Sequence, residues 1–154
     1  MSVTFEHPNL HLDLRQDVLE ILQASLVGAD PYRAVRDALE LNGSTLTFGN
    51  RTIDLGEIGD IYVVGAGKAA APMAQAIEDV LGDRLRKGVV SVKDGYRVPT
   101  SEIAVGEAAH PMPDERSLKA ARTVGHVADM ADEDDLVVAL VSGGGSSVIE
   151  LPAG

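Results

Sequence analysis

A short apolar run, followed at once by two closely spaced glycines and a helix-forming stretch, constrains the fold of this chain more than any other feature. Residues Ile61–Val64 are apolar and mostly β-branched, as in a strand covered on both faces. Gly65 and Gly67 follow, and from Ala69 onward the residues favour a helix with one apolar face. The segment therefore predicts a buried strand, a tight turn and a helix, the opening unit of an α/β sheet.

The turn at residues 65–70 reads G-A-G-K-A-A, which matches the G-x-G-x-x-(G/A) pattern of dinucleotide- and phosphate-binding turns. Lys68 in the first helical turn opposes the helix dipole at a cost of about 0.3–1 kcal/mol. A phosphate held between the lysine and the backbone amides would offset that cost; a solvated surface lysine is the alternative. The turn is not a Walker A loop, because Tyr62 occupies the place of the first glycine and Ala69 that of the Ser/Thr.

Composition narrows the classes of protein. No apolar run approaches the ~18 residues of a membrane span, and the N-terminus lacks the pattern of a signal peptide. The absence of cysteine excludes disulfides and thiolate metal sites and fits a cytoplasmic protein. A net charge of −11 argues against a nucleic-acid surface. The acidic surface fits an ordinary soluble protein or, as a hypothesis, a high-salt cytoplasm.

The remaining periodicity predicts helices alternating with strands. Helices are expected at 10–26, at 31–41, where Asn42-Gly43 ends the helix, and at 115–130; strands are expected at 87–92, 103–108 and 136–141. Residues 45–48 and 51–55 flank Gly49-Asn50 and predict a β-hairpin, placed as an antiparallel edge of the main sheet. This order predicts an α/β fold with a doubly wound, mainly parallel, Rossmann-like sheet, preceded by two helices and a hairpin.

Ligands of such sheets bind at the carboxyl ends of the strands, where two further loops are expected. His110 opens a stiff loop that contains two prolines and reaches Asp114. Such a loop could orient a substrate hydroxyl or carboxylate. A rigid connector, with Asp114 as the N-cap of the next helix, is the alternative that the spacing alone favours.

The loop after the most apolar strand contains Ser142, Gly143, Gly144, Gly145, Ser146 and Ser147. Three consecutive glycines are conformationally costly and are expected where backbone amides and serine hydroxyls wrap an anion; a flexible loop is the alternative. The serines flank the glycines, so the G-x-S-x-G nucleophile motif is not supported. The histidines form no ligand-like pair on a helix, so no metal site is predicted in this chain. Two phosphate-type loops on one sheet indicate a nucleotide or a phosphorylated substrate.

Together these motifs resemble the glycerate 2-kinase family, also called the MOFRL family. The likeness rests on Val-Val-Gly65-Ala-Gly67-Lys68-Ala-Ala, on His110-Pro-x-Pro-Asp114-Glu and on Ser142-Gly-Gly-Gly-Ser146, in that order. It covers the chain from about Asp13. Ala109 stands where glycine is expected, and Ser147 where alanine is common; both are small residues.

The resemblance implies an ATP-dependent enzyme, working with Mg²⁺, that phosphorylates the 2-hydroxyl of D-glycerate and forms 2-phosphoglycerate. It implies a Rossmann-like N-terminal domain and a smaller C-terminal domain, with the site in the cleft between them. Lys68 resembles the active-site lysine that neutralises the transferring phosphoryl group. The Ser142–Ser146 loop would bind phosphates, and His110 and Asp114 would lie at the rim of the cleft.

Residues 1–154 are therefore expected to be the N-terminal part of a longer kinase, inactive alone, with the C-terminal domain and the magnesium ligands beyond Gly154. Two alternatives stay open. One is a sugar-phosphate-binding α/β module without chemistry. The other is an NAD(P)-dependent hydroxypyruvate reductase, for which Asp94 could bind the ribose, although Lys93 and Lys68 favour phosphate. The expected partners are D-glycerate and ATP, with no nucleic acid or membrane, and a homo-oligomer stays open.

Overall fold

The computed structural model describes residues 12–152, and the chain divides into two compact units at the bond between Asp30 and Pro31. The first unit contains the helix α1 (Leu12–Gly28). The predicted start of this helix, at residue 10, lies outside the described residues, and its end lies two residues beyond the predicted one. None of the helices in the described part is both long and apolar enough to cross a membrane.

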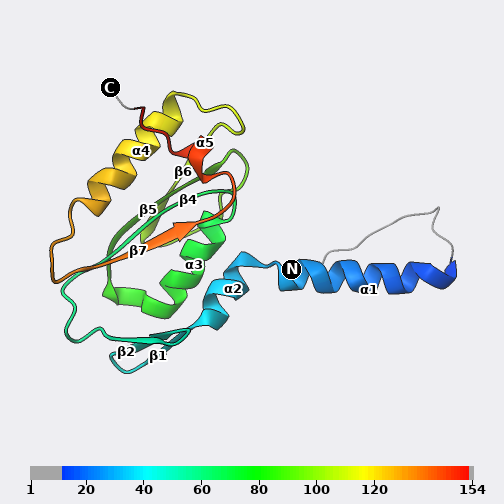
Figure 1. Ribbon diagram of the computed structural model, residues 1–154, viewed down its shortest axis with the longest axis horizontal. Helices are drawn as coiled ribbons and strands as arrows, with labels where there is room; N and C mark the ends of the chain where they lie inside the picture. The colour runs from blue at the N-terminus through cyan, green and yellow to red at the C-terminus, as the bar shows by residue number, and fades with distance from the viewer. Residues whose placement is uncertain (1–11, 153–154) are drawn as a thin grey trace. The chain divides into compact units, whose positions relative to one another are not determined.

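The second unit holds the remaining described elements (Figure 1). In chain order these are α2 (Pro31–Ala38), β1 (Leu39–Asn42), β2 (Thr45–Phe48), β3 (Arg51–Asp54), β4 (Ile61–Ala66), α3 (Ala70–Leu81), the 3₁₀ turn η1 (Gly82–Arg84), β5 (Leu85–Lys93), β6 (Ile103–Ala108), α4 (Glu115–Ala128), β7 (Leu136–Val141) and the short helix α5 (Gly145–Val148).

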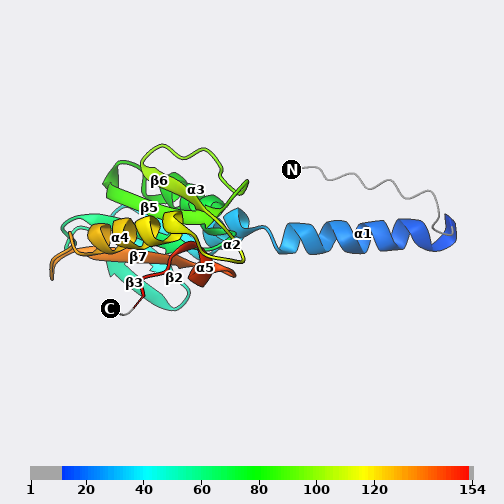
Figure 2. The ribbon, with the colours of Figure 1, turned by 90° about the horizontal axis from the view of Figure 1, so that it is seen from above.

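The main sheet is parallel, with the strand order β6-β5-β4-β7. Figure 2 shows β6 and β7 on opposite sides of the sheet. In Figure 1, α3 lies on one face and α4 on the other. The predicted fold class, a doubly wound and mainly parallel α/β sheet, is confirmed.

Strand β4 lies at the centre of this arrangement and is buried along its whole length. Its side chains alternate between two cores, because successive residues of a strand point to opposite faces. Val63 packs with the α3 residues Ala74 and Ile77, whereas Val64 packs in a second cluster with Val127 of α4. The sequence-based prediction of a strand covered on both faces is thus correct for β4.

The N-terminal part of the second unit differs from the prediction in two ways. Strands β2 and β3 form the predicted antiparallel hairpin, but with β1 they make a separate three-stranded sheet and not an edge of the main one. The second predicted helix also ends early, at Ala38, and Leu39–Asn42 is a strand. Leu39 and Leu41 follow the alternation of a strand, and Leu41 pairs with Leu46 of β2. Pairing with a neighbouring strand therefore overrides the local preference of these residues for a helix.

Most of the other predicted boundaries are confirmed within a few residues. Strands β6 and β7 match the predicted ranges, and β5 extends the predicted strand at both ends. Helix α3 ends before Gly82, which has a φ of +53°, a conformation that suits glycine. Helix α4 begins after its N-cap Asp114 as predicted, and ends at Ala128, two residues early.

Candidate active site at the carboxyl edge of the sheet

The three motifs singled out in the sequence lie together at the carboxyl edge of the parallel sheet. Lys68 follows β4, His110 follows β6 and Gly144 follows β7. A Cβ atom added to Gly144 would lie 2.8 Å from His110 Nε2 and 3.5 Å from Lys68 Cε. Both side chains therefore meet at the backbone of Gly144, and segments far apart in the sequence form one candidate site.

The backbone amides of the first glycine turn are used within the protein. Each of the four consecutive amides from 67 to 70 donates a hydrogen bond to a protein acceptor. The pairs are Gly67 N–H to Ser91 O (3.0 Å), Lys68 N–H to Gly143 O (3.0 Å), Ala69 N–H to Ser142 Oγ (3.0 Å) and Ala70 N–H to Gly67 O (3.1 Å). Two of these amides, those of Lys68 and Ala69, hold the second loop, and the other two bond to β5 and within the turn. All four are thus used in a way different from the anion cradle that the motif predicts.

The glycines of this turn allow the second loop to approach closely. Gly67 has a φ of +126°, and a Cβ atom there would overlap the Ser142 side chain. A Cβ atom on Gly65 would lie 2.5 Å from the carbonyl oxygen of Leu140 in β7. Both glycines are required by close packing between β4 and β7. The side chain of Lys68, in contrast, is exposed.

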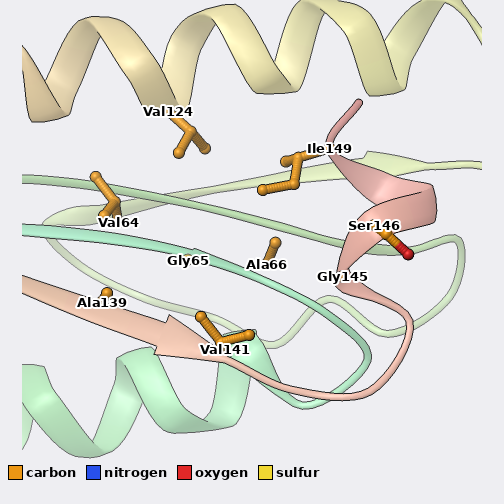
Figure 3. Close-up of a pocket in the computed structure, with 9 residues that line it drawn as sticks. All are labelled: Val64, Gly65, Ala66, Val124, Ala139, Val141, Gly145, Ser146 and Ile149. Carbon is orange, nitrogen blue, oxygen red and sulfur yellow. The ribbon is translucent and has the colours of Figure 1, made fainter. Parts of the chain in front are cut away.

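The second glycine loop keeps hydrogen-bond donors open. Ser142 and Gly145 donate their amides to protein oxygens. None of the hydrogen bonds found among residues 12–152 uses the amides of Gly143 and Gly144. Ser146 is exposed, and its hydroxyl is visible at the edge of α5 in Figure 3. With the Lys68 ammonium group nearby, these donors are what an anionic ligand requires.

Two buried serines that sequence reasoning missed hold this loop from behind. Ser91 Oγ donates to Val148 O at 2.8 Å, and Ser117 Oγ donates to Ser147 O at 2.8 Å. The exposed fractions of Ser91 and Ser117 are 1% and 0%. The signals were available in the sequence: Ser91 is a polar residue in an apolar strand, and Ser117 is at the third position of a helix whose N-cap had been identified.

Asp114 acts as the helix cap that the connector alternative predicts. Its carboxylate accepts the amides of Arg116 (2.9 Å) and Ser117 (3.3 Å), and Ser117 Oγ accepts the Asp114 amide in return. Arg116 Nε donates to Asp114 Oδ2 at 2.8 Å. The hydrogen bond from Arg116 is the largest cause that lowers the pKa of Asp114 below its ordinary value. His110 is the residue of this loop that reaches the second glycine loop.

The guanidinium group of Arg116 also binds Asp94, which follows β5. Its two terminal nitrogens donate to the two Asp94 carboxylate oxygens at 2.6 and 2.8 Å. This bond is the largest cause that lowers the pKa of Asp94, and the two aspartates raise the pKa of Arg116. A carboxylate already held by a bidentate arginine is poorly placed to bind a ribose, which counts against the role that a reductase would give Asp94.

A magnesium ion finds no ready site in the described part of the chain. Among residues 12–152 no group of three His, Asp or Glu side chains could hold a metal ion. His126 is exposed on α4.

Fold and site together define the class: a doubly wound α/β domain that brings two glycine-rich loops, a lysine and a histidine to the ligand-binding edge of its sheet. The family described as "Domain of unknown function (DUF4147)" matches residues 17–154, and the chain belongs to it.

Several similar proteins are named glycerate kinases, in agreement with the resemblance seen in the sequence. The chain is 38% identical over 141 residues to a glycerate 2-kinase of Pyrococcus horikoshii, covering 92% of this chain and 31% of that protein. A crystal structure of glycerate kinase from Thermotoga maritima matches with a TM-score of 0.72 and 36% identity, over 92% of this chain and 31% of that one. A putative hydroxypyruvate reductase of Agrobacterium vitis is 39% identical over 140 residues, 91% of this chain and 29% of that protein. The chain therefore spans less than a third of the length of these relatives.

Proposed function

We propose that the full-length protein carrying this chain phosphorylates D-glycerate at its 2-hydroxyl with ATP, giving 2-phosphoglycerate. The observation that carries the proposal is the meeting of Lys68 and His110 at Gly144, next to two unused backbone amides. The glycerate 2-kinase of Pyrococcus horikoshii and the glycerate kinase of Thermotoga maritima, 38% and 36% identical to this chain, support the choice of substrate.

In this proposal Lys68 stabilises the negative charge of the transferring phosphoryl group. Its ammonium group is exposed, and its side chain lies against the loop whose amides are open. The amides of Gly143 and Gly144 and the hydroxyl of Ser146 donate hydrogen bonds to phosphate oxygens. ATP supplies the phosphoryl group that these donors orient. Electrostatic stabilisation and positioning of this kind are the main contributions of a protein to phosphoryl transfer.

His110 serves as the proposed contact to glycerate. Its Nε2 atom lies at the glycine loop, within reach of a substrate hydroxyl or carboxylate bound beside the phosphate. Asp114 contributes indirectly, by capping α4 and fixing the loop that His110 opens. The two loops are held against each other by hydrogen bonds of the Ser142 and Gly145 amides and by the close approach that Gly65 and Gly67 permit.

Two further points belong to the same proposal. Magnesium, which such a kinase needs, would be held by residues other than those described, because residues 12–152 offer no three-ligand group for it. A protein in which residues 1–154 stand alone would also lack an opposite wall to exclude water from the transferring group. We therefore expect this piece by itself to be inactive.

The reductase alternative has two observations in its favour, the G-x-G-x-x-A turn at residues 65–70 and the name of the Agrobacterium vitis relative. The structure weighs against it, because the amides of residues 67–70 are already bonded within the protein and Asp94 is held by Arg116. A pyrophosphate and a ribose would need those same groups.

The test is an assay of the full-length protein with D-glycerate, ATP and magnesium, coupled to enolase without a phosphoglycerate mutase. Enolase converts the 2-phospho product but not the 3-phospho product, so a signal establishes both the kinase and the position of phosphorylation. The same protein is assayed with hydroxypyruvate and NADH or NADPH. Absence of glycerate-dependent ADP release at low and high salt would overturn the kinase proposal; oxidation of the nicotinamide would favour the reductase, and binding of a sugar phosphate but not ATP would favour the binding module.

A further inference from the structure

The loop that carries His110 is tied at both of its ends to a single residue, Asp94. Residues 109–114 connect β6 to α4. Just before them, the carbonyl oxygen of Ala108 accepts the Asp94 amide at 3.2 Å. Just after them, Arg116 in the first turn of α4 donates two hydrogen bonds to the Asp94 carboxylate, at 2.6 and 2.8 Å. Asp94 therefore fixes the two ends of this loop relative to each other.

The same arginine also bonds to the cap of α4. Arg116 Nε donates to Asp114 Oδ2 at 2.8 Å, so one planar guanidinium group joins the residue after β5 to the residue before α4. We call the side chains of Asp94, Arg116 and Asp114 the clasp. A bidentate pair of arginine and carboxylate has a defined geometry, and lysine, which presents a point charge, does not reproduce it. The clasp thus sets a distance as well as a charge.

The clasp lies at an exposed place where it contributes little to stability. The side chains of Arg116 and Asp94 are 48% and 52% exposed, and exposed ion pairs stabilise a fold only weakly. The loop that they close, in contrast, lies at the carboxyl edge of the sheet, where ligands bind. Because Pro111 and Pro113 restrict its backbone, fixing the ends of the loop also restricts the residues between them.

His110 is the residue whose position depends on this loop. A Cβ atom on Gly144 would lie 2.8 Å from His110 Nε2, so the imidazole lies against the second glycine loop. Among residues 12–152, none of the hydrogen bonds or ion pairs found uses the His110 ring. The ring is therefore held in place by the backbone that carries it and by its contact with Gly144, and not by a polar partner of its own.

We propose that Arg116 and Asp94 are positioning residues for the contact between His110 and the glycerate substrate. By fixing both ends of the loop, the clasp keeps His110 Nε2 beside the second glycine loop. Asp94 itself does not bind the substrate, because Arg116 occupies both of its carboxylate oxygens. The inference rests on the proposed role of His110 toward glycerate.

The first test is steady-state kinetics of the full-length Asp94→Asn protein. Loss of the clasp should raise KM for glycerate roughly tenfold, with KM for ATP changed by less than about twofold. The direction is informative, because removing a negative charge near an anionic substrate would by itself lower this KM. Asp60→Asn is the matched control, since Asp60 forms an exposed ion pair with Arg86 at the amino edge of the same sheet. An unchanged or lower KM for glycerate in Asp94→Asn would overturn the proposal.

Arg116→Lys separates the geometry of the clasp from its charge. It should raise KM for glycerate as Asp94→Asn does, and the two substitutions together should be no worse than either alone. The melting temperature of each variant should stay within about 3 °C of the wild type at neutral pH. A wild-type KM in Arg116→Lys, KM effects that multiply in the double variant, or a larger fall in melting temperature would each contradict a positioning role.

Diethyl pyrocarbonate, which modifies imidazole nitrogens, reports on His110 without any turnover. Peptide mass spectrometry of the full-length protein gives its modification rate relative to that of His126, which is exposed on α4. This ratio should rise at least roughly threefold in Arg116→Lys, because the loop opens more often. An unchanged ratio would refute the clasp even in an active kinase. A raised ratio in a protein that does not phosphorylate glycerate would support the positioning of His110 and overturn the proposed function instead.

Discussion

The two glycine loops of this protein look alike in sequence and differ in structure. Each follows the carboxyl end of a strand, and the two strands, β4 and β7, are neighbours. The four amides from Gly67 to Ala70 are all bonded within the protein, whereas those of Gly143 and Gly144 take no part in the hydrogen bonds of the described residues. The first loop is therefore a support with a lysine at its tip, and the second is the one that can receive an anion.

The two loops are also held by different means. The first is fixed by close backbone approach, which only glycine at positions 65 and 67 permits. The second is fixed from behind, by the hydroxyls of the buried residues Ser91 and Ser117. A glycine-rich pattern alone does not distinguish these cases. The distinction depends on which amides find protein acceptors after folding, and the following substitutions test it.

Substitution of Lys68 by methionine should have the largest effect, on the reaction proposed above. We expect kcat to fall roughly 100- to 1,000-fold, because a charge on the transferring group loses its partner, while the free energy of unfolding changes by less than about 0.5 kcal/mol at an exposed position. Lys119→Met, at an exposed position of α4, is the control. Steady-state kinetics and urea unfolding of the full-length protein give both values. Activity within a few fold of the wild type would exclude a role for Lys68 in phosphoryl transfer.

Gly67→Ala should destabilise the protein by roughly 2–4 kcal/mol, because the added Cβ overlaps Ser142 and the φ of +126° is unfavourable for alanine. Gly125→Ala in α4 is the matched control, since no atom lies within 4 Å of a Cβ there and alanine favours a helix. Urea unfolding measures both. If the two substitutions have equal effects, the first loop is not held by close packing.

Ser117→Ala should cost about 1–2 kcal/mol of stability, because the partly buried carbonyl of Ser147 and the amide of Asp114 lose their hydroxyl partner. We also expect KM for ATP to rise, since Ser117 supports the second glycine loop, which is proposed to bind phosphate. Ser101→Ala, at an exposed position, is the control. A Ser117→Ala protein with unchanged stability and unchanged KM would contradict the role of this serine as a support of the second loop.

The smallest effect is expected from Arg116→Gln, through the acid side of the stability curve. Arg116 lowers the pKa of Asp94 and of Asp114 in the folded protein. The ion pairs therefore contribute stability above the unfolded aspartate pKa of about 3.9 and lose it as the pH falls through the lower, folded values. The melting temperature of the wild type should thus fall more steeply below pH 4 than that of the variant. Parallel curves for the two proteins would show that these exposed pairs contribute no measurable stability.

Sequence reasoning succeeded for elements whose residues carry their own signal. The strand at 136–141 is apolar throughout, and α4 has an aspartate cap, so both could be located directly. It failed at 39–42, where two leucines fit a helix as well as a strand and pairing with β2 decided the outcome. It also placed the hairpin on the main sheet, because nothing local in a hairpin says which sheet it joins.

For the candidate site, the sequence by itself determined which residues are available: a lysine after β4, a histidine after β6 and a glycine loop after β7. The tertiary structure decided which of their groups are free. The amides of Lys68 and Ala69 are bonded because β4 and β7 are adjacent, and that of Gly67 because β5 lies on the other side of β4. Ser91 and Ser117 support the second loop because α5 packs against β5 and α4. Hydrogen bonds between residues far apart in sequence depend on strand order and crossover direction, and these are properties of the whole sheet rather than of any one motif.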